Sequence, residues 1–185
     1  NRIRWICIGA VLLGITLHHS NGPRLQHGLT ATYFYDSNFT SIASTRVENV
    51  AMASSNDKLI PHDRPFSIRW DGYLWTNQIR DVVITIPNTL NARLLLNGKL
   101  VNHIHGEDHS KPFTLTYQLN PGTHTITLEL ERPKPHEQFF STGLQWESSV
   151  GHRLIPSTFL YPSLPDASLA RTEYRLSQVR LLSAW

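Results

Sequence analysis

The sequence predicts a mainly β protein, an antiparallel β-sandwich, with one transmembrane helix at its N-terminal side. Three observations support this prediction. Apolar and polar residues alternate along several short segments, as in strands that have one buried face. Asn97-Gly98 lies between two apolar runs and is the strongest short hairpin signal, because both turn positions need positive φ. Residues 3–17 are apolar apart from Arg4 and form the candidate membrane segment.

Length and composition limit the possible function. The 185 residues suffice for one well-buried domain with a short appendage, and 40% hydrophobic residues are ordinary for a globular chain. The net charge is +3, and the basic residues are scattered rather than gathered into a stripe, so we expect no nucleic-acid partner. Cys7 stands alone inside an apolar run, so we expect an inert buried thiol and no intramolecular disulfide.

Residues 1–20 are predicted to form a membrane anchor. Arg2 and Arg4 precede the apolar run and polar residues follow it, which is the order found in secretory signals and signal anchors. A helix over residues 3–17 spans about 22 Å of the roughly 30 Å hydrocarbon core, and snorkelling arginines and local thinning can cover the difference. The residues expected to contact the bilayer are Trp5, Ile6, Ile8, Val11, Leu12, Leu13, Ile15 and Leu17.

The segment is present in the chain, so we expect an uncleaved single-pass anchor rather than a removed signal. The N-terminus would then be cytoplasmic and the β-domain periplasmic or extracellular. The alternative, a core helix of the globular domain, is disfavoured because the run is apolar on all sides. Residues 21–27 contain Gly and Pro without periodicity and are predicted to be a linker.

The central predicted segment is residues 66–74, which contains a strand. Phe66, Ile68 and Trp70 alternate with polar residues, and Gly72 is expected to end the strand in a turn. The other predicted strands are 28–35, one strand within 41–63, 82–86, a hairpin over 93–101, 113–119 and 123–131. Glu129 and Glu131 are expected to lie together on the outward-facing side of their strand, as ordinary alternation implies.

The central strand resembles the F-S-[VI]-R-W-x-G strand of the protective-antigen domain family, a β-sandwich of bacterial toxins, adhesins and glycosidases. Other segments are similar to motifs of the same family and follow in the family's order: Gly28–Tyr35, Arg93–Val101, Thr123–Glu131, Leu144–Trp146 and Ile155–Pro162. The resemblance covers about residues 28–162 and implies a protective-antigen-like β-sandwich there. It leaves residues 163–185 as a tail.

The resemblance also bears on metal binding. Carbohydrate-binding members of the family hold calcium with two adjacent aspartates in a D-D-G sequence. Thr89, Leu90 and Asn91 occupy those positions here, and Thr and Leu cannot supply the hard carboxylate oxygens that calcium prefers. We therefore expect that the calcium-dependent sugar site is lost and that the chain has no cofactor.

Three histidines in the segment 102–109 are the remaining metal candidates. His103, His105 and His109 lie close to two acidic residues and could ligate zinc or another transition metal. The spacing of a known tetrahedral site is absent, so a solvated loop is favoured over a metal site.

Catalytic motifs are also absent from the sequence. It contains no G-x-S-x-G elbow, no P-loop and no C-x-x-C-H haem attachment. We therefore expect a chain that is not an enzyme and has no catalytic residue.

The tail is predicted to be helical or partner-docking. Pro165-Asp166 can start a helix, and the candidate docking residues are Tyr174, Leu176, Leu182 and Trp185. Packing of this segment on its own sandwich is an equal alternative.

Two functions remain open. The first is a non-catalytic, single-pass accessory subunit of a larger membrane complex, with an energy-converting (respiratory or photosynthetic) complex as one candidate host. The second is a membrane-anchored carbohydrate-binding module without calcium, in which loop residues such as Trp75 and Asn77 form the glycan site. The expected partners are accordingly other membrane subunits, the lipid bilayer and, in the second case, glycans.

Overall fold

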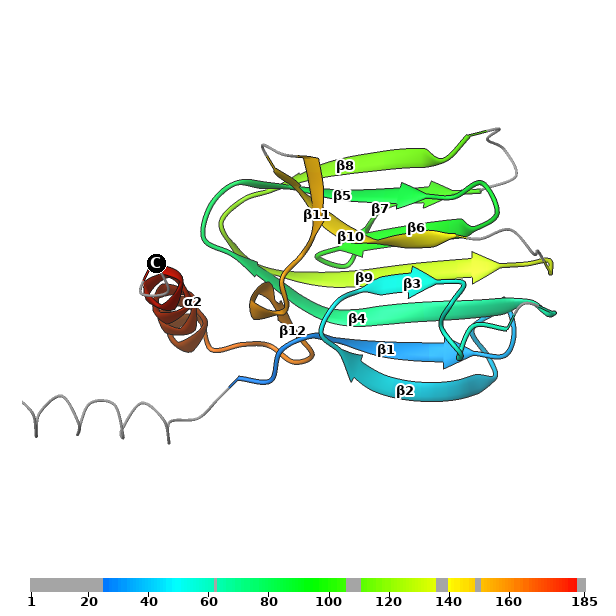
Figure 1. Cartoon of the computed structure of the whole chain (residues 1–185), viewed down its shortest axis with the longest axis horizontal. Coiled ribbons are helices and arrows are strands. Elements are labelled where there is room, and N and C mark those ends of the chain that lie inside the picture. The colour runs from blue at the N-terminus through cyan, green and yellow to red at the C-terminus, as the bar shows by residue number, and fades with distance from the viewer. Residues whose placement is uncertain (1–24, 62, 106–110, 136–139, 149–150, 183–185) are drawn as a thin grey trace, which may run out of the picture.

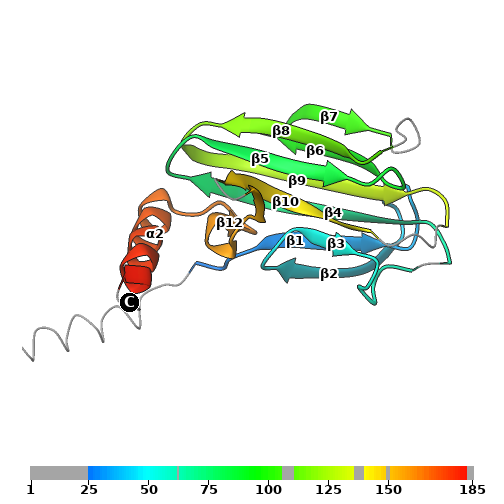
Figure 2. The same ribbon diagram turned by 45° about the horizontal axis from the view of Figure 1, so that its top comes forward.

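Two antiparallel sheets face each other in the computed structural model (Figures 1 and 2). The structure describes residues 25–61, 63–105, 111–135, 140–148 and 151–182. The predicted anchor, with its residues from Trp5 to Leu17, lies outside these ranges. Among the described residues, no helix is both long and apolar enough to span a membrane.

The larger sheet contains the central strand of the sequence prediction. In spatial order its described strands are β2 (Ile42–Glu48), β1 (Leu29–Phe34), β4 (Phe66–Thr76), β9 (Gly122–Arg132), β6 (Asn91–Leu96) and β7 (Lys99–Ile104), and β12 (Leu160–Tyr161) also pairs with β4. β4 and β9 are paired along the full length of both strands. This pair forms the middle of the sheet.

The smaller sheet covers one face of the larger one. Its described strands are β11 (Gly151–Leu154), β10 (Ser141–Ser148), β5 (Arg80–Ile86) and β8 (Phe113–Leu119), with β3 (Met52–Ser54) paired to β10. The prediction of a single strand within 41–63 is therefore wrong. The chain forms β2 in the larger sheet and then crosses to the smaller sheet, where the small side chains of Ala51 and Ala53 are buried.

Alternation along the central strands places the core between the sheets, as predicted. Ile68 and Trp70 of β4 are fully buried, as are Leu128 and Leu130 of β9. The hairpin prediction is also confirmed, because Asn97-Gly98 joins β6 to β7 with φ of 53° and 72°.

Gly72 does not end its strand as expected. β4 continues to Thr76, and Gly72 lies directly before Tyr73 and Leu74, the residues of β4 that pair antiparallel with β12. A Cβ atom at position 72 would lie 2.4 Å from the carbonyl oxygen of Tyr161. Glycine is therefore needed here for a close approach of two backbones rather than for a turn.

The tail forms helix α2 (Ala167–Leu182), which lies at one end of the sandwich (Figure 1). The Asp166 carboxylate caps it by accepting hydrogen bonds from the amides of Ser168 and Leu169. A hydrogen bond from the Ser168 hydroxyl, together with these two amide bonds, holds the pKa of Asp166 below its usual range. Ala170 is fully buried in the core cluster, so the helix packs on its own sandwich.

The beginning of the domain contacts the same helix. Glu173 of α2 pairs with His27 at 3.0 Å and accepts a hydrogen bond from the amide of Leu25 at 3.3 Å. The short 3-10 helix η2 (Ser157–Phe159) lies next to β12 and β4, and its Phe159 ring contacts Tyr174 of α2. Segments from both ends of the described chain therefore meet at one end of the sandwich.

Candidate functional site

The outer face of the larger sheet carries a row of charged and polar side chains. Strand register aligns Arg69 of β4 with Glu129 of β9, Glu129 with Arg93 of β6, and Arg93 with His103 of β7. Their neighbours along β4, β9 and β6 belong to the core, as does Ile104 next to His103, so alternation directs this row away from the smaller sheet. Four adjacent strands thus contribute one side chain each to a single line.

Glu129 is the centre of this row. Its Oε1 accepts a hydrogen bond from Arg69 Nε at 2.7 Å and lies 2.6 Å from Arg69 Nη2, while its Oε2 lies 2.6 Å from Arg93 Nη2. The Glu129 side chain is 7% exposed, whereas those of Arg69 and Arg93 are 35% and 43% exposed. Two guanidinium groups therefore cover and neutralise a buried carboxylate.

Glu129 occupies the outward-facing position that alternation predicts. The residue does point outward from the sheet, but it is not solvated, because the arginines on both neighbouring strands lie over it. Glu131, one step along the outer face, is half-buried and accepts a hydrogen bond from Asn91 Nδ2 at 2.7 Å.

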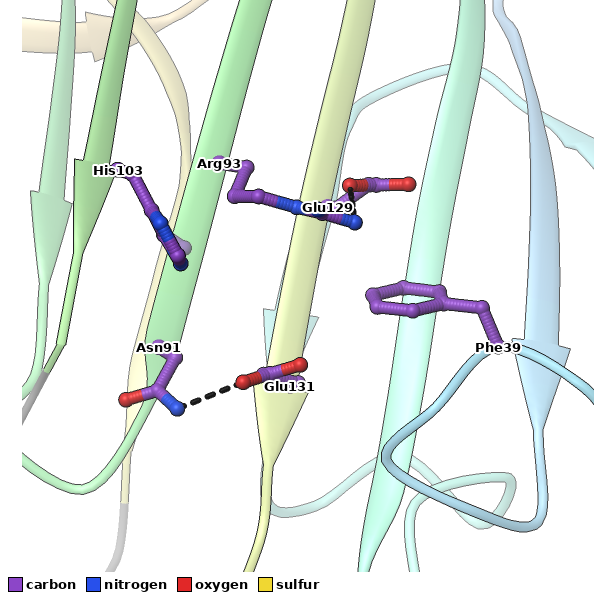
Figure 3. Close-up of a pocket in the computed structure, with 7 residues that line it drawn as sticks. Phe39, Asn91, Arg93, His103, Glu129 and Glu131 are labelled. Carbon is purple, nitrogen blue, oxygen red and sulfur yellow. Dashed lines mark hydrogen bonds and ion pairs between the residues drawn. The ribbon is translucent and has the colours of Figure 1, made fainter.

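A shallow depression lies beside this row (Figure 3). It opens between β6 and β9 on one side and the β1–β2 loop on the other. Its lining combines hydrogen-bond donors, acceptors and an aromatic ring: Phe39, Asn91, Ala92, Arg93, His103, Glu129 and Glu131. In Figure 3, Phe39 points toward the two glutamates from one side, and Asn91 and His103 lie on the other.

Phe39 is carried over the sheet by the β1–β2 loop. Its φ is 58°, in the left-handed region that a non-glycine residue seldom adopts. The Arg69 and Arg93 guanidinium carbons lie 5.0 Å and 5.8 Å from the ring centroid, and Phe34 contacts the ring edge-on at 5.5 Å. Backbone strain at a residue that also borders a depression is typical of functional sites.

Asp36 holds the loop in this conformation. Its carboxylate accepts hydrogen bonds from the Thr40 hydroxyl at 2.7 Å and from the amides of Asn38 and Ser41 at 2.8 Å and 2.7 Å. The Thr40 bond is the main cause of a pKa for Asp36 of about 2. The Ser67 hydroxyl of β4 donates to the Asp36 carbonyl and ties the loop to the sheet.

This arrangement is suited to holding a polar ligand. Each guanidinium has five N–H donors in a fixed plane, and Glu129 uses at most two of those on each arginine. Glu131 supplies carboxylate acceptors, and the Phe39 ring supplies apolar surface next to them. Two arginines face two glutamates, so the charges of the site balance.

No protein-family model and no curated protein matches this sequence. Solved structures do share the fold. An anti-sigma factor domain-containing protein superposes with a TM-score of 0.59 at 22% identity, over 76% of this chain and 51% of that one. This chain thus spans about half the length of that relative.

Two further structures match most of their own length. The PA14 (protective-antigen) domain of the antifreeze protein MpAFP has a TM-score of 0.52 at 12% identity, over 77% of this chain and 94% of that one. The epithelial adhesin 6 A domain of Candida glabrata, in complex with Galβ1-3GlcNAc, has a TM-score of 0.50 at 13% identity, over 80% and 92%. These likenesses support a protective-antigen-like fold.

The residues predicted to bind glycans are not brought together. Trp75 is not on a loop: it lies near the end of β4 and is 4% exposed, with Phe159 and Tyr174 beside its indole. Asn77 follows in the turn after β4 and is exposed. The Trp75 prediction is corrected accordingly, because its ring belongs to the core.

The metal candidates are partly brought together. The rings of His103 and His105 lie 4.2 Å apart, and His109 is outside the described residues. Within the described ranges, no group of three or more His, Cys, Asp or Glu side chains could hold a metal. At the positions that correspond to the family's calcium ligands, Leu90 is fully buried and the Asn91 side chain donates a hydrogen bond to Glu131.

The tail residues differ from one another. Tyr174 packs on Trp75 and Phe159, so its docking partner is the chain's own sandwich. Leu176 is 38% exposed on α2, and Leu182 is the last residue of that helix. Trp185 lies outside the described residues.

The residues of the outer-face site were not found from the sequence. Arg69, Arg93 and Glu129 all occupy outward positions of predicted strands, and opposite charges on neighbouring strands could have been the signal. The sequence does not reveal which strands are neighbours or in which register they pair. Phe39 carried no such signal, because its position depends on the folded loop.

Proposed function

We propose that this chain is a non-catalytic carbohydrate-binding module, and that it binds glycans on the outer face of the larger sheet without calcium. One observation carries the proposal: Glu129 fixes two half-exposed arginines beside the ring of Phe39. Donors held in position by the protein lose little conformational freedom when a ligand binds. Their free N–H groups would donate to sugar hydroxyls, and Phe39 would cover an apolar sugar face.

The charge balance of the site favours a neutral sugar over an anion. An acidic ligand attracted to Arg93 would also approach Glu131, which lines the same depression. A hydroxyl-rich ligand can donate to the carboxylate and accept from the guanidinium at the same time. We therefore expect neutral glycans to bind more tightly than uronic or sialic acids.

Location outside the cytoplasm is part of the proposal. It rests on the apolar, positively flanked segment 1–20, which would hold the β-sandwich at the outer surface of a membrane. A module in that place has access to glycans.

A glycan array followed by calorimetry would test this function. The full chain in mild detergent would be compared with its Phe39→Ala and Arg93→Ala variants, with and without a chelator. We expect neutral glycans to bind in both conditions, and each substitution to reduce affinity at least tenfold, about 1.4 kcal/mol.

Arg153→Ala is the matched control, because Arg153 is an exposed arginine in β11 of the smaller sheet. It should leave affinity unchanged. The proposal would be wrong if no glycan bound, if a chelator abolished binding, or if the Arg93 and Arg153 variants behaved alike.

The accessory-subunit function remains a second candidate. It is favoured by the side of α2 that the sandwich leaves uncovered, where Arg171, Arg175 and Leu176 are exposed. Extraction of native membranes in mild detergent, followed by sizing and mass spectrometry, would test it. A fixed stoichiometric complex would support this function, whereas a chain that migrates without other subunits would count against it.

A further inference from the structure

The strand orders of the two sheets end in four edge strands among the described residues, and three of these strands are protected against pairing with another chain. β2 contains Arg46 and Glu48, and its pairing with β1 has a register shift. β7 contains Lys99, and its pairing with β6 has a second register shift. β11 is only four residues long and contains Arg153. Charges, bulges and short length are the usual features that prevent edge-to-edge association.

β8 is the exception. It runs for seven residues, Phe113–Leu119, without a charged residue or proline, and its pairing with β5 shows no register shift. In the described part of the chain, β5 is the only strand to which β8 is hydrogen-bonded, and Figure 1 shows β8 at the edge of the smaller sheet. A long, regular and uncharged edge is a template for another strand.

The side chains of β8 are also incompletely covered. Thr114, Thr116 and Gln118 are exposed on one face of the strand. On the other face, Leu115 is half-buried against the core, and Tyr117 is 40% exposed although it pairs with the buried Val82. Apolar side chains of the core therefore extend to the β8 edge of the smaller sheet, where they are only partly covered.

We propose that β8 pairs antiparallel with β8 of a second copy of this chain, with the two-fold axis at Thr116. In that register Thr114 lies opposite Gln118 of the second copy, and Leu115 lies opposite Tyr117. Polar side chains then meet polar ones on the outer face, and apolar side chains meet apolar ones on the inner face. The pairing is self-complementary, as a two-fold interface requires.

The absence of charge favours a second copy as the occupant. If β8 bound a strand of another protein through charge complementarity, β8 itself would need charged residues. Residues 113–119 contain no charged residue. A charged β8 would place like charges near the axis of a symmetric pair, and that repulsion is missing here. The half-covered Leu115 and Tyr117 would bury each other, which accounts for their exposure in the single chain.

The symmetric register can be tested by cross-linking. The full chain, with Cys7→Ser, would carry either Thr116→Cys or Thr114→Cys and would be oxidised in mild detergent. Directly opposed residues of an antiparallel pair have Cα atoms about 4.5–5.5 Å apart, within disulfide range. The two copies of position 114 would be about 14 Å apart, because four residues of strand separate them.

We expect the Thr116→Cys chain to form a covalent dimer at least tenfold faster than the Thr114→Cys chain, which is the matched control. A mixture of Thr114→Cys and Gln118→Cys chains should cross-link to each other. Equal rates at positions 114 and 116 would overturn the proposal, since they would indicate random collision.

Sedimentation of the chain without introduced cysteines gives the second measurement. Thr116→Lys places two positive charges on the axis and should weaken dimerisation at least tenfold, whereas Thr45→Lys on the protected β2 edge should not. A monomer at every concentration would refute the pairing, and so would a dimer that Thr116→Lys leaves unchanged, because the latter would arise at another surface. Neither result depends on whether the chain binds glycans.

Discussion

The ring of Tyr174 in α2 lies 5.7 Å from the indole of Trp75 in β4, inclined at 56°. The sequence assigned these two residues to different external partners, a docking protein and a glycan. In the folded chain they are partners of each other, and Phe159 contacts both. α2 therefore belongs to the domain, because its aromatic side chain completes a cluster at the end of the core.

Removing Tyr174 should loosen α2. Tyr174→Ala deletes a half-buried ring that contacts two other aromatic residues, and we expect a loss of about 1–3 kcal/mol in the free energy of unfolding. Urea denaturation would measure the loss, and limited proteolysis would show earlier cleavage in α2. Leu176→Ala, an exposed site on the same helix, is the control and should cost less than about 0.5 kcal/mol. Equal losses in the two variants would contradict the packing of α2.

The carboxylate of Glu129 should contribute to stability through both arginines. Glu129→Gln keeps the shape of the side chain but removes the charge that Arg69 and Arg93 share. We expect a loss of about 1–2 kcal/mol, less than for a fully buried ion pair because both guanidinium groups are partly solvated.

Glu131→Gln is the matched control for this change. Its amide oxygen can still accept the hydrogen bond from Asn91, so the cost should be small. A double-mutant cycle of Glu129→Gln with Arg93→Ala would measure the coupling, and additive losses would show that the pair contributes nothing.

The β1–β2 loop should respond to acid. The pKa of Asp36 is about 2 in the folded chain against an ordinary value of 3.8. Because the pKa of Asp36 is lower in the folded chain, its ionised carboxylate stabilises the folded loop fully above about pH 4. This stabilisation is lost as the pH falls through about 2. Amide resonances of Asn38 and Ser41 should therefore shift only at the acid end of a titration. In an Asp36→Asn chain this acid-dependent shift should disappear, and its persistence would assign the transition to another group.

Gly72 should tolerate no side chain. In Gly72→Ala the new methyl group would meet the Tyr161 carbonyl at 2.4 Å and the Leu29 side chain at 2.8 Å. We expect a loss of about 1–3 kcal/mol from this overpacking. Gly122→Ala is the comparison, because Gly122 has a similar φ but nothing within 4 Å of the added atom. Thermal unfolding should show a clearly larger decrease for position 72, and similar decreases would exclude a steric cause.

Features encoded within one segment could be predicted from the sequence. The hairpin at Asn97-Gly98 depends on two adjacent residues, and the burial of Ile68 and Trp70 depends on alternation within one strand. The cap at Asp166 is similarly local. Each of these was predicted because its cause lies within a few residues of its effect.

Features that depend on other strands could not be predicted. Gly72 resembles a turn residue until β12 is known to pair with β4 beside it, and the turn expected there placed Trp75 on a loop instead of in β4. The burial of Glu129 results from arginines that are distant in sequence and adjacent only through strand register. For the same reason, the fold could be predicted from the sequence, but the residues that form the outer-face site could not.

The described ends of the chain and the outer-face depression lie in different parts of the sandwich. Leu25, His27 and α2 meet at one end, and β1 runs from there to the loop that carries Phe39 (Figure 1). Along β4, Arg69 lies about 20 Å from Trp75, at 3.3 Å per residue. A membrane or protein attached through the N-terminal side or through α2 would therefore contact the domain at that end of the sandwich. The outer-face depression would stay clear of that attachment and remain open to a large or branched ligand.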